Sequence, residues 1–86
     1  MIYKISIRKQ ALKELENFPA PENRKIFKEI DSLAFNPRPP GCKKLKGEFE
    51  NLWRIRTGNY RIIYSIDDVI KIIDIRNIGH RKDIYD

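Results

Sequence analysis

The chain has 86 residues, of which 18 are basic and 12 acidic, and it contains a single cysteine. This length allows one domain, residues 1–86, and a hydrophobic share of 41% is typical of a globular protein rather than a disordered one. One cysteine excludes an internal disulfide and a cysteine-based zinc cluster, and no apolar run approaches the roughly 20 residues that span a membrane. We therefore expect a small cytoplasmic protein with no membrane partner.

The first part of the chain is predicted to form a strand followed by two helices. Residues 2–7 are β-branched, aromatic and nearly alternating in polarity, which is typical of a strand. Residues 8–18 place apolar side chains at helical spacing, and Pro21 suits the first turn of a second helix whose apolar stripe runs from Ile26 to Ala34. The short proline-marked connection predicts an antiparallel helical hairpin.

The second part of the chain is predicted to form a three-stranded meander after a proline-rich loop at residues 36–41. The strand-like runs cover residues 52–57, 60–66 and 69–78. Gly58-Asn59 and Asp67-Asp68 predict tight turns between them. The predicted fold is α+β, a four-stranded and mostly antiparallel sheet with the helical hairpin on one face, in the order β-α-α-β-β-β.

The basic excess is concentrated between residues 43 and 64, which contain six basic and two acidic side chains. The six cations are Lys43, Lys44, Lys46, Arg54, Arg56 and Arg61. A localised excess favours a polyanionic partner, either a nucleic acid or an acidic protein segment. The alternative is a solvated basic face that only aids solubility.

A two-residue turn at Gly58-Asn59 would fix the position of three arginines. Arg56 would lie opposite Arg61, and strand alternation would place both with Arg54 on one exposed face, while the apolar residues of the hairpin face the helices. Like charges directly opposite cost up to about 1 kcal/mol, and guanidinium groups suit bidentate phosphate contacts. We therefore expect an anion site, the alternative being arginine stems that cover the sheet while their heads spread into water.

Residues 79–86 contain the only histidine, two further cations and a tyrosine. If this segment folds back along the sheet, His80, Arg81 and Tyr85 could reach the arginines. Metal-free RNA cleavage needs a base for the 2′-hydroxyl, an acid for the leaving oxygen and cations for the phosphorane charge. Histidine or tyrosine can exchange protons, whereas arginine chiefly stabilises charge. The alternatives are a surface histidine and a packed terminal aromatic, and the acidic residues show no metal-ligand spacing.

Two strings of this sequence resemble the RelE side of the RelE/ParE toxin superfamily. They are KKLKGEFENLWRIRTGNYRIIYSI at residues 43–66 and IRNIGHRKDIYD at residues 75–86. The resemblance extends over nearly the whole chain. It implies a toxin of a type II toxin–antitoxin system that cleaves mRNA in the ribosomal A site without metal or cofactor. It also implies neutralisation by an acidic, RelB-like antitoxin, with the toxin monomeric inside their hetero-oligomer.

The resemblance implies roles for individual residues. Catalytic or phosphate-binding positions would be Arg54, Arg56, Arg61, Arg81 and Tyr85, with Arg61 at the scissile phosphate and Arg81 at the leaving group. Contacts to mRNA and ribosomal RNA would come from Lys43, Lys44, Lys46 and Lys82.

The general base stays unassigned at this point. The best-known RelE pattern has lysines where this chain has Arg54 and Arg56, and arginine effectively cannot lose its proton. His80 or Tyr85 is therefore the better candidate base. Two other functions stay open: a ParE-like toxin that inhibits DNA gyrase by protein contact, and an inactive relative that only binds its antitoxin.

Overall fold

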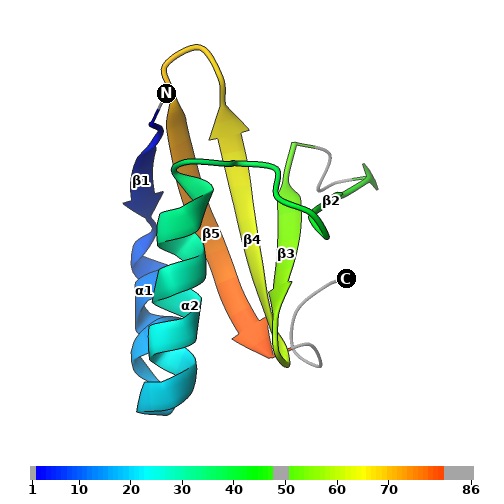
Figure 1. The fold of residues 1–86 in the computed structure, drawn as a ribbon. Helices are drawn as coiled ribbons and strands as arrows, with labels where there is room; N and C mark the ends of the chain where they lie inside the picture. The colour runs from blue at the N-terminus through cyan, green and yellow to red at the C-terminus, as the bar shows by residue number, and fades with distance from the viewer. Residues whose placement is uncertain (1, 48–50, 81–86) are drawn as a thin grey trace.

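The computed structural model describes residues 2–47 and 51–80, which form two helices and a five-stranded sheet. The elements are β1 (Lys4–Ile7), α1 (Lys9–Glu16), α2 (Ala20–Leu33), β2 (Lys43–Lys44), β3 (Trp53–Thr57), β4 (Tyr60–Asp67) and β5 (Ile72–His80). The strand order is β1-β5-β4-β3-β2, with β1 parallel to β5 and the other neighbours antiparallel (Figure 1). The predicted α+β class and the helical pair on one face are confirmed.

The predicted count of four strands is wrong because the short strand β2 adds a fifth. Lys43 and Lys44 pair antiparallel with Arg54 and Trp53 at the outer edge of the sheet. Two consecutive lysines show neither alternation nor β-branched side chains, so the sequence pattern contains no signal for this strand. Its consequence is that β3 is an internal strand over its first two residues and an edge strand beyond them.

The predicted two-residue turn at Asp67-Asp68 is also wrong, because four residues, 68–71, connect β4 to β5. The Asp67 carboxylate accepts hydrogen bonds from the backbone amides of Val69 and Ile70, both at 3.0 Å, which is an Asx-type turn. Lys71 then adopts a φ of 58°. Val69 and Ile70 resemble the start of a strand in the sequence, but their side chains are 90% and 63% exposed at this turn.

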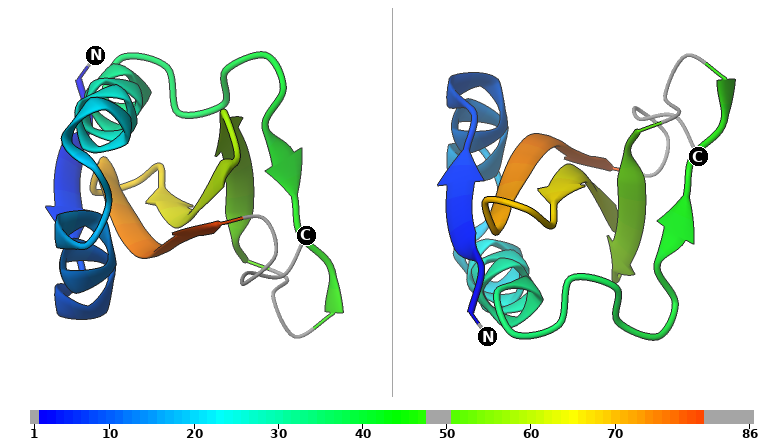
Figure 2. Two further views of the ribbon diagram at one scale, coloured as in Figure 1. Left: turned by 90° about the horizontal axis from the view of Figure 1, so that it is seen from below. Right: turned by 90° about the horizontal axis from the view of Figure 1, so that it is seen from above.

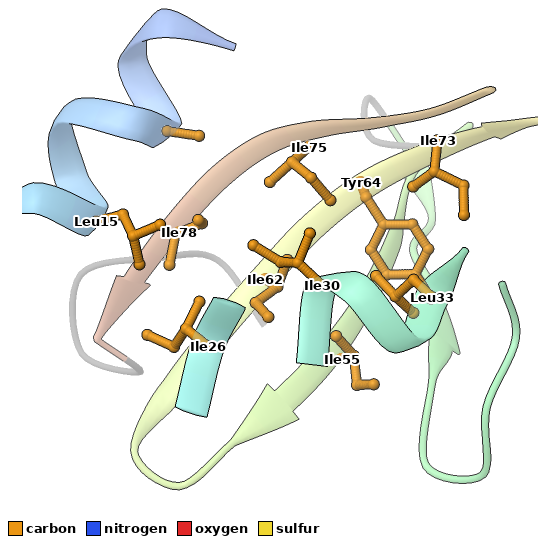
Figure 3. Close-up of a cluster of buried hydrophobic side chains, with 11 residues drawn as sticks. Leu15, Ile26, Ile30, Leu33, Ile55, Ile62, Tyr64, Ile73, Ile75 and Ile78 are labelled. Atoms are coloured by element: carbon orange, nitrogen blue, oxygen red, sulfur yellow. The ribbon is translucent and has the colours of Figure 1, made fainter. Parts of the chain in front are cut away.

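The hydrophobic core lies between the helices and one face of the sheet (Figure 3). Leu15 of α1 and Ile26 and Ile30 of α2 pack there against isoleucines of β3, β4 and β5 and against the fully buried Tyr64. Burial of such side chains supplies the main driving force of folding, at roughly 1.5–3 kcal/mol each. The side-chain amide of Asn23 also donates to the carbonyl of Leu15 at 2.8 Å and so joins the two helices.

Two contacts fix the loop between α2 and β2 above the sheet. The hydroxyl of Tyr64 donates to the carbonyl of Pro37 at 2.7 Å, and burial raises the pKa of this phenol. The guanidinium of Arg38 lies 5.0 Å from the ring centroid of Trp53 and makes an ion pair of 2.9 Å with Asp68. The loop therefore has a defined position beside the outer strands.

The Arg38–Asp68 pair predicts a dependence of stability on pH. Hydrogen bonds from Arg38 and from the Tyr3 hydroxyl lower the pKa of Asp68 from 3.8 to about 2. A carboxyl group with a lowered pKa in the folded state stabilises the fold above its unfolded pKa and loses that contribution as the pH falls through its folded pKa.

We therefore expect Asp68→Asn to lower the free energy of unfolding at pH 6, by a modest amount because the group is exposed. The difference from the unmodified protein should shrink between about pH 4 and pH 2. Urea unfolding followed by circular dichroism across this range measures it, with Asp31→Asn on the exposed side of α2 as the matched control. Equal losses for both variants at every pH would contradict the assignment to the Arg38 pair.

Candidate nucleic-acid interface

The β3–β4 hairpin has the register that the sequence predicts. Gly58 and Asn59 are the only loop residues, Thr57 pairs with Tyr60, and Arg56 lies directly opposite Arg61. Gly58 has a φ of +59°, as the first central residue of a type II′ turn requires, and glycine adopts this conformation without steric cost. The turn therefore fixes which side chains of both strands share a face.

The three arginines of the hairpin lie on the face of the sheet that is turned away from the helices. Ile55 and Ile62 belong to the core, and alternation places Arg54, Arg56 and Arg61 on the opposite side. This part of the prediction is confirmed.

The prediction that all three arginines are exposed is wrong. Arg54 is 4% and Arg61 6% exposed, and only Arg56 is open to solvent. Arg61 stands on the central strand β4, between Arg56 and Gly79, and Arg54 lies inside the sheet because β2 flanks it. Arg56 lies beyond the end of β2. Each of the three takes part in interactions within the chain, as burial of a charge requires.

A cleft of about 440 Å³ brings two of these arginines together with a lysine. The cleft is lined from β2 and β3 by Lys43, Arg54, Ile55 and Arg56, and from the neighbouring loop and α2 by Pro40–Cys42 and Glu29. It lies where β2 ends and leaves the outer edge of β3 open. Three cations around one concave surface attract an anion, and two guanidinium groups provide planar donors that fit phosphate oxygens.

Sequence reasoning missed Glu29 in this cleft. Its position in α2 directly precedes the buried Ile30 and follows the buried Ile26 by three residues, so it lies beside the apolar stripe of the helix. From this spacing, the sequence could have been used to predict that Glu29 lies near the sheet. Its carboxylate reduces the positive potential of the cleft.

Lys44 and Lys46, which were also predicted to contact RNA, do not line the arginine cleft. Lys44 is exposed, with its ammonium 6.0 Å from the ring centroid of Trp53, and Lys46 is exposed after β2. Both therefore lie on the outer edge of the sheet, beyond the cleft. The predicted site residues Arg81, Lys82 and Tyr85 lie outside the described residues.

The expectation that His80 could reach the arginines is wrong. His80 pairs with Tyr60 across β4 and β5, with the ring centroids 5.7 Å apart, and Tyr60 packs against the core on the helix side. A β-bulge explains this placement. Ile63 pairs with Asn77 and Tyr64 with Ile75, so β5 has an extra residue between them and its later side chains change face.

A second cleft, of about 310 Å³, contains His80. Its walls are Glu22 and Lys25 of α2, Tyr60 and the residues 57–59 at the end of the hairpin. These segments meet at the end of the molecule where α2 begins and β5 ends (Figure 1). The two clefts thus lie on different parts of the β3–β4 hairpin.

The described part of the chain contains neither a candidate metal centre nor a helix that could span a membrane. Among residues 2–47 and 51–80, no group of three or more histidine, cysteine, aspartate or glutamate side chains could hold a metal ion. None of the helices described is long and apolar enough to cross a bilayer. The half-buried Cys42 lines the arginine cleft.

Comparison with known protein families gives a match that covers almost the whole chain. Residues 5–85 match the model of the family described as ParE toxin of type II toxin-antitoxin system, parDE. The sequence is 41% identical to the RelE1 protein of Methanocaldococcus jannaschii, over 99% of this chain and 97% of that protein. It is 34% identical to the toxin RelE3 of the same organism, over 96% of each chain.

Solved structures show the same fold. The toxin chain in the archaeal RelE–RelB complex from Pyrococcus horikoshii superposes with a TM-score of 0.83 and 32% identity, covering 98% of this chain and 100% of that one. That structure pairs a RelE protein with a RelB protein. The helical pair and the twisted sheet of this chain (Figure 2) are therefore shared with that structure.

Proposed function

This chain belongs to the RelE/ParE superfamily of type II toxins, and on that premise we propose that it is an endoribonuclease that cleaves mRNA in the ribosomal A site. The observation that carries the proposal is the gathering of Lys43, Arg54 and Arg56 around one cleft, with Arg61 directly opposite Arg56. Two guanidinium groups at such a position provide planar donors for the oxygens of a phosphorane.

The proposed reaction is attack of a ribose 2′-hydroxyl on the adjacent phosphorus. The new P–O2′ bond closes a 2′,3′-cyclic phosphate while the P–O5′ bond breaks. The proton of the 2′-hydroxyl passes to the base, a proton is delivered to the leaving 5′-oxygen, and the proposed step uses no metal or cofactor. Arg54, Arg56 and Arg61 stabilise the charge of the phosphorane, and Arg81 supports the leaving oxygen.

Arginine cannot act as the base, and His80 lies on the helix side. We therefore propose Tyr85 as the group that exchanges a proton.

Binding to the ribosome rests on the lysines around the sheet edge. Lys44 and Lys46 are exposed there, and with Lys82 they provide sequence-independent contacts to RNA phosphates. The proposed target places the action of the protein in the cytoplasm.

The proposed inhibitor is an acidic, RelB-like antitoxin that binds one toxin monomer within a hetero-oligomer. The net charge of +6 speeds association with an acidic chain. Both RNA and antitoxin would therefore compete for one basic surface.

The family description names ParE toxins, so inhibition of DNA gyrase through protein contact is the second candidate function. Expression of the chain under an inducible promoter separates the two. The proposal predicts new mRNA 5′-ends inside translated codons within minutes of induction, with plasmid supercoiling unchanged. Gyrase trapped on plasmid DNA, together with intact mRNA, would contradict it. An absence of any growth defect would instead indicate an inactive relative that only binds its antitoxin.

A further inference from the structure

The loop between α2 and β2, residues 34–42, runs from the end of α2 to the outer edge of the sheet (Figure 1) and contributes Pro40–Cys42 to the lining of the arginine cleft. Its prolines at positions 37, 39 and 40 have no amide hydrogen to donate, which reduces the number of backbone hydrogen bonds that the loop can make. The strand that follows, β2, has only two residues, too few to hold its place in the sheet without other contacts. Side-chain contacts of the loop therefore have to fix the position of this wall.

Arg38 makes the strongest of these side-chain contacts. Its guanidinium group donates two hydrogen bonds to the carboxylate of Asp68, at 2.9 and 3.4 Å, and the hydroxyl of Tyr3 donates to the same carboxylate at 2.6 Å. The guanidinium group also lies over the ring of Trp53, 5.0 Å from its centroid. Paired hydrogen bonds of this kind fix the orientation of a guanidinium group as well as its position. Arg38 therefore ties the loop both to β3 and to the turn between β4 and β5.

This anchor, made of Arg38, Asp68 and Trp53, is connected to the arginine cleft in two ways. Arg38 directly precedes two prolines whose φ angles are locked, so its position is passed on with little freedom to the lining residues Pro40–Cys42. Trp53 directly precedes Arg54 on β3, which also lines the cleft. The contact between Arg38 and Trp53 therefore sets how far the loop lies from β3, and so how wide the cleft is.

We propose that Arg38 is a positioning residue: held between Asp68 and Trp53, it keeps the loop close to β3, so that the three cations of the arginine cleft stay gathered around one phosphate group. This rests on the proposed function and adds to it a control of phosphate affinity from outside the cleft, because neither Arg38 nor Asp68 is among the described residues that line it. Loss of a negative charge ordinarily strengthens the binding of an anion to a basic protein. Loss of the Asp68 carboxylate should instead weaken it, because the loop then loses its anchor.

Phosphate binding without cleavage gives the first test. A labelled hexauridylate with 2′-O-methyl groups cannot be cleaved, because it has no 2′-hydroxyl, and its binding is followed by fluorescence polarisation at low salt. Asp68→Asn should bind it about threefold more weakly, a loss of the size expected for one exposed ion pair. Asp68→Glu, which keeps the carboxylate, should restore most of the affinity.

Asp31→Asn is the matched control for this measurement. It makes the same charge change on the exposed side of α2 and should bind the hexauridylate at least as tightly as the unmodified protein does. Equal or tighter binding by Asp68→Asn would overturn the inference, because the carboxylate would then act through its charge alone.

The fluorescence of Trp53 gives a second test, since this residue is the only tryptophan of the chain. Asp68→Asn should shift its emission to longer wavelength, because the indole loses the cover of Arg38 and meets more water, and Asp31→Asn should leave the emission unchanged. Circular dichroism at the same temperature checks that each variant is folded. Weaker binding with an unchanged Trp53 spectrum would overturn the inference, since Asp68 would then act by another route. The expected changes in binding and emission, together with no cleavage of ribosome-bound mRNA by the unmodified protein, would contradict the proposed function alone.

Discussion

Replacement of Arg61 by alanine should lower the rate of mRNA cleavage on the ribosome by at least about 100-fold, the loss typical of one removed donor to a developing oxyanion. Arg61 is held on the central strand with 6% of its surface exposed, so its guanidinium is fixed before substrate binds. A charge that is already in position does not have to be reoriented when the transition state forms, so none of its stabilising energy is lost to that reorientation. The measurement is the single-turnover rate with saturating ribosome-bound mRNA.

Two further variants distinguish chemistry from folding at Arg61. Arg61→Lys keeps the charge but not the planar donor pair, so we expect a loss smaller than that of alanine but still above tenfold. Arg24→Ala, an exposed arginine of α2 outside both clefts, should cleave at the normal rate. Each variant is checked by thermal unfolding. Full activity of a folded Arg61→Ala protein would contradict the role assigned to this residue.

The same RNA sequence should be cleaved at least about 1,000-fold faster in the ribosomal A site than free in solution. The arginine cleft supplies charge, but the groups among its described lining residues that can exchange a proton are Glu29, Lys43 and Cys42, and none of them is the proposed base. Alignment of the 2′-hydroxyl with the phosphorus therefore has to come from the ribosome, and orientation alone is worth many orders of magnitude in rate.

This ratio is measured with one labelled oligonucleotide, free and bound to programmed ribosomes, at equal toxin concentration. A low-salt series controls for weak binding of free RNA, because contacts to phosphates strengthen as salt falls. Similar rates on free and bound RNA at saturation would show that the protein aligns its substrate alone, and would contradict this part of the proposal.

The hairpin was predictable from the sequence because a two-residue turn with glycine leaves one register. Gly58 fixes the turn, and Arg56 must then oppose Arg61. The core was predictable for a similar reason, since apolar residues at helical spacing, such as Ile26 and Ile30, mark the buried stripe of α2.

The burial of the arginines and the face of His80 could not be predicted from local pattern. Arg54 is 4% exposed and pairs with Lys43 of β2, a strand for which two lysines give no signal. His80 faces the helices because of the bulge in β5. The isoleucines at 73, 75 and 78 do break strict alternation, but a sequence alone does not show whether such a break is a bulge or the end of a strand.

The most direct test of the account is the mapping of mRNA 5′-ends on ribosomes stalled at a known codon, with purified protein and with Arg61→Ala. The account predicts one cut within the A-site codon for the unmodified protein, and its loss in the folded variant. Intact mRNA with the unmodified protein would contradict the account, and so would the same cut, at the same rate, with Arg61→Ala.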